Sequence, residues 1–479
     1  MRVVVLSVAL LVLVGCGSAE PAAEPGRTPR VTAVQAPLPE NAKGRYNVGL
    51  TSVACAAPGN CAATGYRDSN TLSRGLLFVE QDGVWSVSEP PLPQILRPGN
   101  QSVTVSSVAC PAVGHCVAVG MAASGRQLVP LVFAQRPHGW RETLAPLPAG
   151  VKSGVLDFVS CPSAGNCTAA GTYLLDESDG TWKATTADLP PNGSATTSGQ
   201  SPVIEDLSCG APGDCAAVGL YGDTHGSPQG WLLTEMDGVW ARGVEARLPA
   251  NASTEEGSYL YPAIDFAVSC APDGDCTAVG GYGDRQSHQF GLILSEHAGN
   301  WGRARQAPLP ANAGPNPQQG NAPRSPLGAI ACPSAGDCTA VGWYLDDGGG
   351  YHGLLLRERG GAWSPSDLVL GSGTDVAPES LPGISLDSVA CPSVGNCLAV
   401  GSYNPSPRRL RPLLVPERNG SWGTGVEAPP PAGAAKSYNG SLSSVSCPTE
   451  ETCVAVGNTE TAGYLDARGL IVTIRRGRP

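Results

Sequence analysis

The cysteines are the residues whose type and spacing could do chemistry in this chain. Sixteen of the 17 cysteines fall into pairs with five residues between the partners. Such pairs could form disulfides, bind metal or act in redox reactions. The eight pairs are Cys55 and Cys61, Cys110 and Cys116, Cys161 and Cys167, Cys209 and Cys215, Cys270 and Cys276, Cys332 and Cys338, Cys391 and Cys397, and Cys447 and Cys453.

Disulfides are the interpretation that the surrounding residues favour. Structural zinc needs four ligands, and the six histidines occupy no recurring position near the pairs. Redox motifs favour Cys-x-x-Cys rather than many equivalent wider turns. The intervening residues are mostly Pro, Ser, Gly, Asn and Asp, which form tight turns. We therefore predict eight structural disulfides, with no metal site, no cofactor and no catalytic motif.

The unpaired cysteine, Cys16, follows an apolar run that begins after Arg2. This run is typical of a secretory signal and is short for a transmembrane helix. The residues Leu-Val-Gly-Cys at its end resemble the lipobox of bacterial lipoproteins, which implies that Cys16 is lipidated. The alternative is an ordinary cleaved signal with an incidental cysteine. We predict a lipoprotein signal peptide at residues 1–16 and a flexible Pro/Ala-rich tether at 17–30, so that the protein is exported and anchored to the outer face of the bacterial cell membrane.

Composition narrows the classes of partner. The formal net charge of −11 and the scarcity of charged residues, 15%, disfavour binding to a phosphate backbone, so nucleic acid is not expected as a partner. The 62 glycines and 44 prolines suit many short strands joined by turns rather than long helices.

Around the cysteines the sequence repeats eight times. Each copy reads as a hydrophobic segment ending in Cys, a turn, and Cys-x-Ala-Val-Gly or a close variant. A Leu-rich run follows, and then Glu-x-x-Gly-x-Trp, which is intact in six copies and altered to Gln135 in the second. The copies begin the ranges 52–65, 107–120, 158–171, 206–219, 267–280, 329–342, 388–401 and 444–457.

One repeat predicts four short strands, as in a propeller blade. The eighth repeat ends after its third strand, whereas residues 31–42 match the fourth strands of other repeats. We therefore predict an all-β, eight-bladed β-propeller of four-stranded blades in a single domain, residues 31–479. An N-terminal strand pairing with Ile471–Ile474 would complete the last blade and close the ring. An open array or β-solenoid is the alternative architecture.

The turn before the tryptophan, clearest at residues 177–182, resembles the Asp-box turn of sialidase-like propellers. In that family the box is a folding element, so the resemblance carries no activity to this chain. Sialidases assemble an arginine cluster, a tyrosine and acids from several blades, and most have six blades. No motif in this sequence identifies such a cluster.

Candidate ligand-binding residues occur where the second and third strands of a repeat connect. These connections share one end of the predicted blades with long, dissimilar loops, which is where binding residues usually collect. The alternative is that the tyrosines pack between blades and the acids cap turns. The candidates are Tyr66, Arg67, Asp68, Tyr221, Asp223, Tyr282, Asp284, Arg285, Tyr344 and Asp346.

Two functions from different classes remain open. The first is a non-enzymatic binding or scaffolding protein at the cell surface that recognises a protein or a glycan. The second is a sialidase-like carbohydrate-active hydrolase or lyase with its site at the mouth of the central channel. The enzyme should bring two carboxylates, or a tyrosine with an acid and two or more arginines, into one cavity. A binding protein should expose an aromatic rim.

Overall fold

The structure is a computed structural model. It describes residues 29–39, 47–69, 72–93, 96, 102–125, 127–137, 139–194, 202–253, 264–285, 288–314, 327–346, 350–371, 383–406, 409–434, 438–460 and 467–476. Cys16 and most of the predicted tether lie outside these residues. The described residues contain strands and no helix, and therefore no helix that could cross a membrane.

The strands follow the sequence repeats. The first two repeats form β2 (Asn47–Ala57), β3 (Asn60–Ser69), β4 (Leu72–Gln81), β5 (Val84–Ser88), β6 (Val103–Ala109), β7 (Val117–Ser124), β8 (Gln127–Arg136) and β9 (Gly139–Leu144). The third and fourth form β10 (Leu156–Ser163), β11 (Asn166–Gly171), β12 (Leu174–Ser178), β13 (Thr181–Thr185), β14 (Val203–Ala211), β15 (Asp214–Gly222), β16 (Pro228–Met236), β17 (Val239–Trp240) and β18 (Val244–Glu245).

The second half repeats the pattern. The fifth and sixth repeats form β19 (Ile264–Cys270), β20 (Cys276–Gly283), β21 (Gln289–His297), β22 (Asn300–Trp301), β23 (Arg305–Gln306), β24 (Leu327–Ser334), β25 (Asp337–Leu345), β26 (Tyr351–Arg359) and β27 (Ala362–Asp367). The seventh and eighth form β28 (Ile384–Ser393), β29 (Asn396–Ser406), β30 (Arg409–Arg418), β31 (Ser421–Trp422), β32 (Val426–Glu427), β33 (Asn439–Thr449), β34 (Thr452–Glu460) and β35 (Ala467–Arg475), which β1 (Arg30–Gln35) joins.

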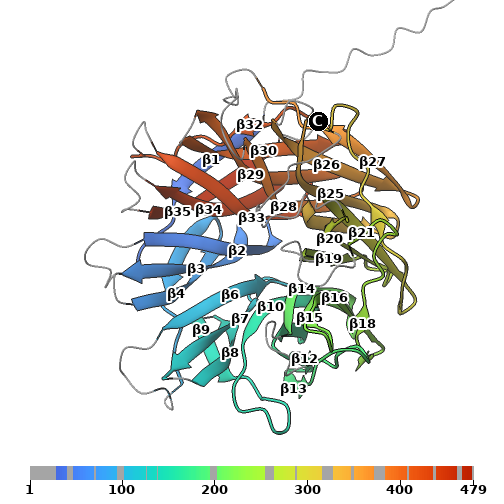
Figure 1. Ribbon diagram of the computed structural model, residues 1–479. Helices are drawn as coiled ribbons and strands as arrows, with labels where there is room; N and C mark the ends of the chain where they lie inside the picture. Colours follow the sequence, from blue (N-terminus) through green and yellow to red (C-terminus); the bar gives the residue numbers. More distant parts are fainter. Residues whose placement is uncertain are drawn as a thin grey trace, which may run out of the picture.

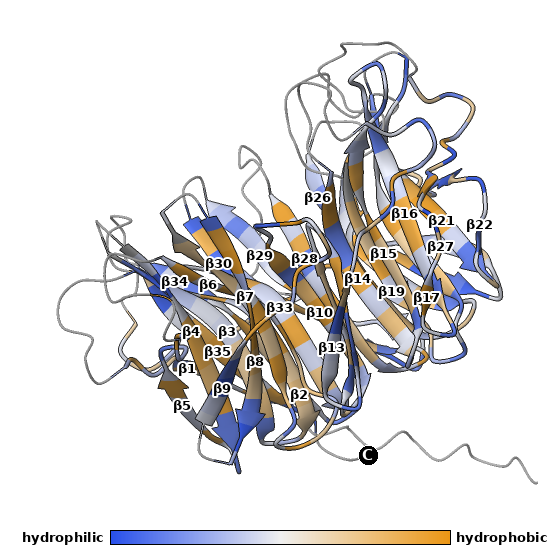
Figure 2. Ribbon diagram, turned by 90° about the horizontal axis from the view of Figure 1, so that it is seen from below, coloured by the Kyte–Doolittle hydropathy of each residue, from blue (hydrophilic) through white to orange (hydrophobic). Residues whose placement is uncertain are grey.

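Each repeat folds into an antiparallel sheet with its strands in chain order, as in β10-β11-β12-β13. A single parallel pairing between Arg74 and Val103 also links the first two repeats into one larger sheet. The sheets fan around a common centre, with β2, β6, β10, β14, β19 and β28 toward the middle (Figure 1). Apolar residues recur along the strands within each sheet, where neighbouring sheets bury them (Figure 2). This is the β-propeller type of architecture.

The N-terminal strand joins the last repeat, as predicted. β1 runs antiparallel to β35, with Val31 opposite Ile474 and Val34 opposite Ile471. Figure 1 shows the blue β1 among the red C-terminal strands. β1 therefore supplies the fourth strand that the eighth repeat lacks, and it covers the edge that β35 would otherwise expose.

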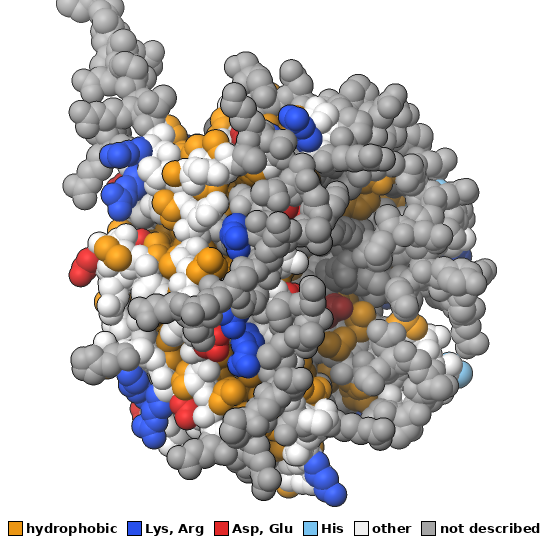
Figure 3. Space-filling view, turned by 90° about the vertical axis from the view of Figure 1, so that its left-hand side faces the viewer, with side chains coloured by type: hydrophobic (Ala, Val, Ile, Leu, Met, Phe, Trp, Pro, Cys, Tyr) orange, Lys and Arg blue, Asp and Glu red, His pale blue; other side chains and the backbone are white. Residues whose placement is uncertain are grey.

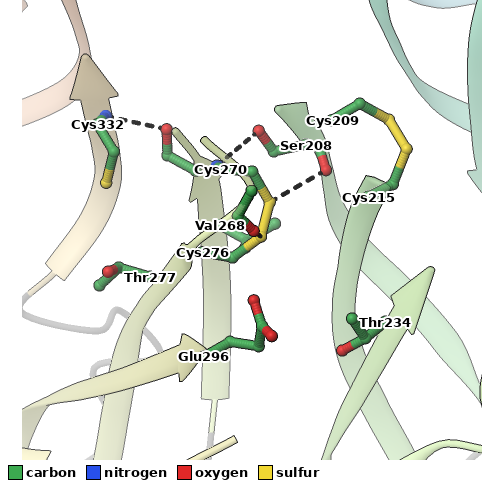
Figure 4. Close-up of a disulfide and its surroundings, with 12 residues drawn as sticks. Ser208, Cys209, Cys215, Thr234, Val268, Cys270, Cys276, Thr277, Glu296 and Cys332 are labelled. Atoms are coloured by element: carbon green, nitrogen blue, oxygen red, sulfur yellow. Dashed lines mark hydrogen bonds between the residues drawn. A yellow bond between two sulfur atoms is a disulfide. The ribbon is translucent and has the colours of Figure 1, made fainter. Parts of the chain in front are cut away.

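Serine side chains connect the innermost strands of successive sheets. The backbone N–H of Cys270 donates to Ser208 Oγ at 2.9 Å, and that of Cys332 donates to Ser269 Oγ at 3.0 Å (Figure 4). The last and first repeats make the same contact, because Cys55 N–H donates to Ser446 Oγ at 3.0 Å. Side-chain hydroxyls thereby satisfy backbone donors on strands that lie too far apart to pair directly.

The turn between the third and fourth strands explains the Gly in Glu-x-x-Gly-x-Trp. Two consecutive residues adopt positive φ, such as Asp237 at 51° and Gly238 at 76°. This is the backbone of a type I′ hairpin turn, which favours Asp-Gly and Asn-Gly. The fifth repeat places Ala298 at φ 48°, a conformation that an alanine side chain disfavours.

The fourth strand is continuous in some repeats and divided in others, whereas the sequence led us to expect one strand throughout. It is divided into β17 and β18, β22 and β23, and β31 and β32. In two of these repeats, eight residues separate Trp from the Leu of Leu-Pro, as from Trp240 to Leu248, but seven do from Trp182 to Leu189. The extra residue bulges out of the strand, and pairing resumes beyond it.

The structure joins all eight cysteine pairs as disulfides, each linking the first strand of a repeat to the second. Figure 4 shows the disulfide between Cys270 and Cys276 beside that between Cys209 and Cys215 in the adjacent sheet. Among the described residues no group of three or more His, Cys, Asp or Glu side chains is arranged to hold a metal ion.

Candidate functional site

The two ends of the sheets carry different connections. At one end, which we call the loop end, the second-to-third strand connection of a repeat lies beside the segment entering that repeat. Bridges from Gly193 to Asp223 and from Ala252 to Asp284 show this arrangement. At the other end, the cysteine end, Gly238 N–H donates to Gly213 O at 2.9 Å, which joins the turn before the Trp to the cysteine turn.

The candidate tyrosines at the loop end are buried. Tyr221, Tyr282 and Tyr344 are at most 3% exposed. They lie inside the second strand of their repeats rather than in the following loop, because the backbone pairing continues through them, as between Tyr221 and Gln229. Our expectation that the loop begins at the tyrosine was therefore wrong by one or two residues.

Each of these phenols is held by the fourth strand of its own sheet. Tyr221 donates to Glu245 Oε2 at 2.9 Å. Tyr282 and Tyr344 make the corresponding bonds to Gln306 at 3.0 Å and to Asp367 at 2.7 Å. An asparagine of the preceding loop lies 3.0–3.1 Å from each phenol oxygen: Asn192, Asn251 and Asn312. Burial and, for Tyr221 and Tyr344, the adjacent carboxylate raise the pKa of these phenols.

The candidate acids hold the following turns. Asp223 accepts hydrogen bonds from the backbone N–H of His225 and Ser227, both at 2.9 Å. Burial opposes ionisation of Asp223, but these N–H groups outweigh it and lower its pKa. Asp284 and Asp346 accept backbone bonds in the same way, and each also lies within 2.9 Å of a histidine ring nitrogen.

The first repeat departs from this arrangement. Arg67 is 9% exposed and donates to Glu89 at 2.8 Å. Tyr66 is partly buried, and burial together with the charges of Asp68 and Glu460 raises its pKa. Asp68 is partly buried beside it, whereas Arg285 in the fifth repeat is exposed. Ligand binding by the candidate residues stays a prediction.

A cluster that we did not select from the sequence surrounds Glu427. Tyr403 donates to Glu427 at 2.7 Å and Tyr438 at 3.2 Å, while Arg411 Nε lies 3.7 Å from the same carboxylate. The Arg411 guanidinium lies over the Tyr438 ring, 4.1 Å from its centre. The cluster holds one arginine, and its Tyr403–Glu427 bond repeats the tyrosine bonds of the three preceding sheets. Alignment of Tyr403 with Tyr344 in the repeats could have identified it.

Partly exposed aromatic side chains gather near the loop ends of the fifth and sixth sheets. Trp343 and Tyr351 lie 5.0 Å apart between ring centres, and His352 stacks on Tyr344 at 5.2 Å. In the fifth sheet Phe290 contacts the buried Tyr282 at 5.7 Å. We call Phe290, Trp343, Tyr351 and His352 the aromatic surface. Such rings can stack on sugars or pack against a peptide.

A second feature lies at the cysteine end, between the third and fourth sheets. A cavity of about 520 Å³, which we call the carboxylate pocket, is lined by Asp176, Glu177, Lys183, Glu235, Asp237 and Trp240 together with neighbouring turn residues. Asp176 accepts hydrogen bonds from Thr168 Oγ1 at 3.1 Å and from Trp240 Nε1 at 3.2 Å. Burial raises the pKa of Asp176 despite these donors and Lys183.

Glu235 occupies the interior of this pocket and is 3% exposed. Its Oε2 atom is buried without a hydrogen-bond partner. Burial raises the pKa of Glu235 to about 8, with further contributions from Asp176 and Asp214. A carboxyl group with this pKa is largely protonated at neutral pH.

No family model matches the chain. No curated protein matches it either. Solved structures with a similar arrangement include YCF48 bound to D1 peptide, with a TM-score of 0.37, 14% identity, and coverage of 77% of this chain and 93% of that one. They also include a Trypanosoma rangeli sialidase in complex with the inhibitor DANA, at 0.38 and 10% identity over 92% and 57%. Chaetomium thermophilum Sqt1 bound to the N-terminus of ribosomal protein L10 gives 0.45 and 10% identity over 90% and 98%.

Proposed function

We propose that this chain is a membrane-anchored lipoprotein whose closed, eight-bladed propeller binds a protein or glycan ligand without catalysis. The aromatic surface at the loop end is the observation that carries the binding function. Rigid strands present its rings, and the second strands of the fifth and sixth sheets are fixed by the bonds of Tyr282 and Tyr344. Preorganised aromatic side chains bind sugars and peptides at low entropic cost.

The contacts between the first and last repeats support a closed ring. Val454, Val456 and Ile471 of the eighth repeat share a hydrophobic cluster with Val48 and Leu50 of the first. The same two repeats are joined by the Ser446 bond to Cys55. These contacts match those between other neighbouring sheets, which is what a ring of eight equivalent blades requires.

The disulfides support export. Many disulfides indicate an oxidising environment outside the cytoplasm. Because the sixteen cysteines of the repeats are paired, Cys16 is the cysteine left for another chemistry. Lipidation of Cys16 would account for it and would hold the propeller near the outer face of the membrane.

A carbohydrate-active hydrolase is the alternative, and the recurrence of the tyrosine bonds disfavours it. A catalytic Tyr–Glu pair is needed once, whereas a tyrosine bonds to an acid or amide in four successive sheets. Gln306 replaces the carboxylate in one of them, and a neutral amide preserves the bond without supplying a base. These bonds therefore fit a structural role.

Photo-crosslinking on living cells tests the proposed binding function. A benzophenone amino acid replaces Tyr351, and, as the control, Val239 at the cysteine end, which is 68% exposed. We expect a discrete adduct from position 351 and none from position 239. Release of reducing sugar from a cell-surface glycan by the purified protein, abolished in Glu427→Gln, would instead establish the hydrolase. Equal labelling from both positions would argue against the aromatic surface.

A further inference from the structure

The buried glutamate recurs in six of the sheets, and it takes different partners in different gaps between sheets. In the gap between the sixth and seventh sheets, Arg357 Nη1 lies 3.1 Å from Glu417 Oε1. The Arg357 and Glu417 side chains are 12% and 0% exposed. The protein thus supplies its own guanidinium to neutralise a buried carboxylate from the adjacent sheet.

The gap between the third and fourth sheets carries the opposite charge at the same position. Arg357 and Asp176 both directly precede the glutamate that pairs with the tryptophan of their own repeat. Glu235 is the counterpart of Glu417. Where one gap holds an arginine facing a glutamate, this gap holds an aspartate, and it is hollow.

Glu235 also differs from the other buried glutamates in its charged surroundings. Burial raises the pKa of all six, and a nearby basic side chain opposes this for every one except Glu235. The opposing bases are Arg475 for Glu80, Arg136 for Glu177, His297 for Glu296, Arg305 for Glu358, and Arg357 with Arg359 for Glu417. Every charged neighbour that acts on Glu235 is an acid.

We propose that the carboxylate pocket binds the guanidinium group of a basic ligand, in the place that Arg357 fills between the sixth and seventh sheets. The unpartnered Oε2 of Glu235 and the Asp176 carboxylate supply the acceptors. A guanidinium offers several N–H donors in a planar fork, so it can bridge two carboxylates. The pocket lies at the cysteine end, so this inference stands apart from the proposed role of the aromatic surface.

The charged groups around the pocket predict how binding depends on pH. Asp176, Glu177 and Lys183 face it from the third sheet, and Glu235 and Asp237 from the fourth, with Asp214 nearby. Because a cation favours the ionised carboxylate, binding releases the proton of Glu235. Affinity should therefore rise with pH up to the pKa of Glu235, by up to about tenfold per pH unit.

Calorimetry on the disulfide-bonded mature chain tests this inference with two guanidines, agmatine and acetyl-Gly-Arg-Gly-amide. The matched neutral probe is the same tripeptide with citrulline in place of arginine. At pH 7 we expect binding of a guanidine, release of about one proton per ligand, and no binding of the citrulline peptide. Tripeptide affinity at least about tenfold above that of agmatine indicates an arginine side chain of a protein partner, and the reverse indicates a free guanidine.

Variants separate the pocket from the fold. Glu235→Gln and Asp176→Asn should each weaken guanidine binding by at least about tenfold, which is the loss of one charge-assisted hydrogen bond. Glu296→Gln is the control, because Glu296 occupies the same position in the next gap, where Thr234 replaces the aspartate (Figure 4). Asp176→Arg should abolish binding and raise the melting temperature at pH 9, since it recreates the pair of Arg357 and Glu417.

Three results would overturn the inference. The first is no detectable binding of either guanidine at millimolar concentration and pH 8. The second is equal affinity for the arginine and citrulline peptides. The third is unchanged binding in both Glu235→Gln and Asp176→Asn. If a variant does not fold, as judged by its circular dichroism, the other variants and the citrulline comparison still decide the question.

Discussion

At the scale of single residues, the buried glutamates set the electrostatic character of the gaps between sheets. The second repeat replaces this glutamate with Gln135, whose side-chain oxygen accepts a bond from Cys116 N–H at 3.2 Å. An amide therefore fits the position and satisfies a backbone donor without a buried charge. The natural substitution indicates that a neutral side chain suffices for folding here.

Glu235→Gln should change how stability depends on pH. The native pKa of Glu235 is about 8, above its value in the unfolded chain, so the native state binds more protons between these two values. The contribution of Glu235 to stability is therefore present at acidic pH and is lost as the pH rises toward 8. Melting temperatures from pH 5 to pH 9 should fall less steeply in Glu235→Gln than in the wild type. An identical slope in the two proteins would contradict the assigned pKa, and Asp237→Asn at the pocket surface is the control.

Ala298→Asn should stabilise the protein by about 1 kcal/mol, because alanine is disfavoured at positive φ and asparagine tolerates it. Ala298 has φ 48°, and Asn419 occupies the same turn position in the seventh repeat at the same angle. Urea denaturation of the two proteins measures the difference. A stability equal to or below that of the wild type would show that this turn does not set the backbone strain we infer.

At the scale of elements, the disulfides and the serine contacts act on the same strands. Each disulfide ties the innermost strand of a sheet to its neighbour, and a serine of the adjacent sheet bonds to some of the same cysteines. The innermost strands would otherwise present unsatisfied backbone groups toward the centre. The cysteine end is therefore held both within and between sheets.

Replacing Cys270 and Cys276 together by alanine should destabilise the protein by about 2 kcal/mol on the chain-entropy estimate for so short a loop. The structure joins these residues across a separation of 6 in sequence. Chemical denaturation under non-reducing conditions checks the value. The double variant and the wild type should become equally stable after full reduction, and a difference that persists would point to lost packing instead.

β1 is the element on which the closed ring depends. Deleting residues 29–35 should lower the melting temperature and promote dimers, because β35 would become an exposed edge strand. Calorimetry and analytical ultracentrifugation measure the two effects. Deleting residues 19–25 of the predicted tether is the matched control and should leave both unchanged. A truncated protein that melts like the wild type would show that β1 does not complete the last blade.

At the scale of the whole molecule, the two ends of the sheets carry separate proposed sites. The aromatic surface lies at the loop end and the carboxylate pocket at the cysteine end, so two ligands need not compete. On the face drawn in Figure 3, the described Lys and Arg side chains stand in separate groups among apolar and uncharged ones. This distribution does not resemble the continuous basic stripe of a nucleic-acid-binding surface.

Cys16→Ser should release the protein from the membrane if lipidation provides the anchor. The mature chain should then appear in the soluble fraction or the culture medium, with the propeller still folded. Fractionation followed by immunoblotting measures this distribution, and the wild type provides the membrane-bound reference. A variant that stays with the membrane would show that another contact retains it.

The sequence by itself determined the features that depend on local chemistry and repetition. The spacing of the cysteines, the turn glycines and the alternating strands recur in every repeat, so they predicted the disulfides, the sheets and the pairing of residues 31–34 with 471–474. One extra residue after Trp240 would also have predicted the divided fourth strand, had the repeats been compared at that position.

Only the tertiary structure decided what lies between the sheets. Asp176 and Glu235 are 59 positions apart, and nothing near either residue indicates that they line one cavity. The tyrosines of the loop end likewise read as ligand candidates until their burial and their bonds to the fourth strand were known. Side-chain environment depends on which neighbouring sheet covers it, and a repeat motif does not encode the differences between neighbours. Those differences give one gap an internal ion pair and another a pocket.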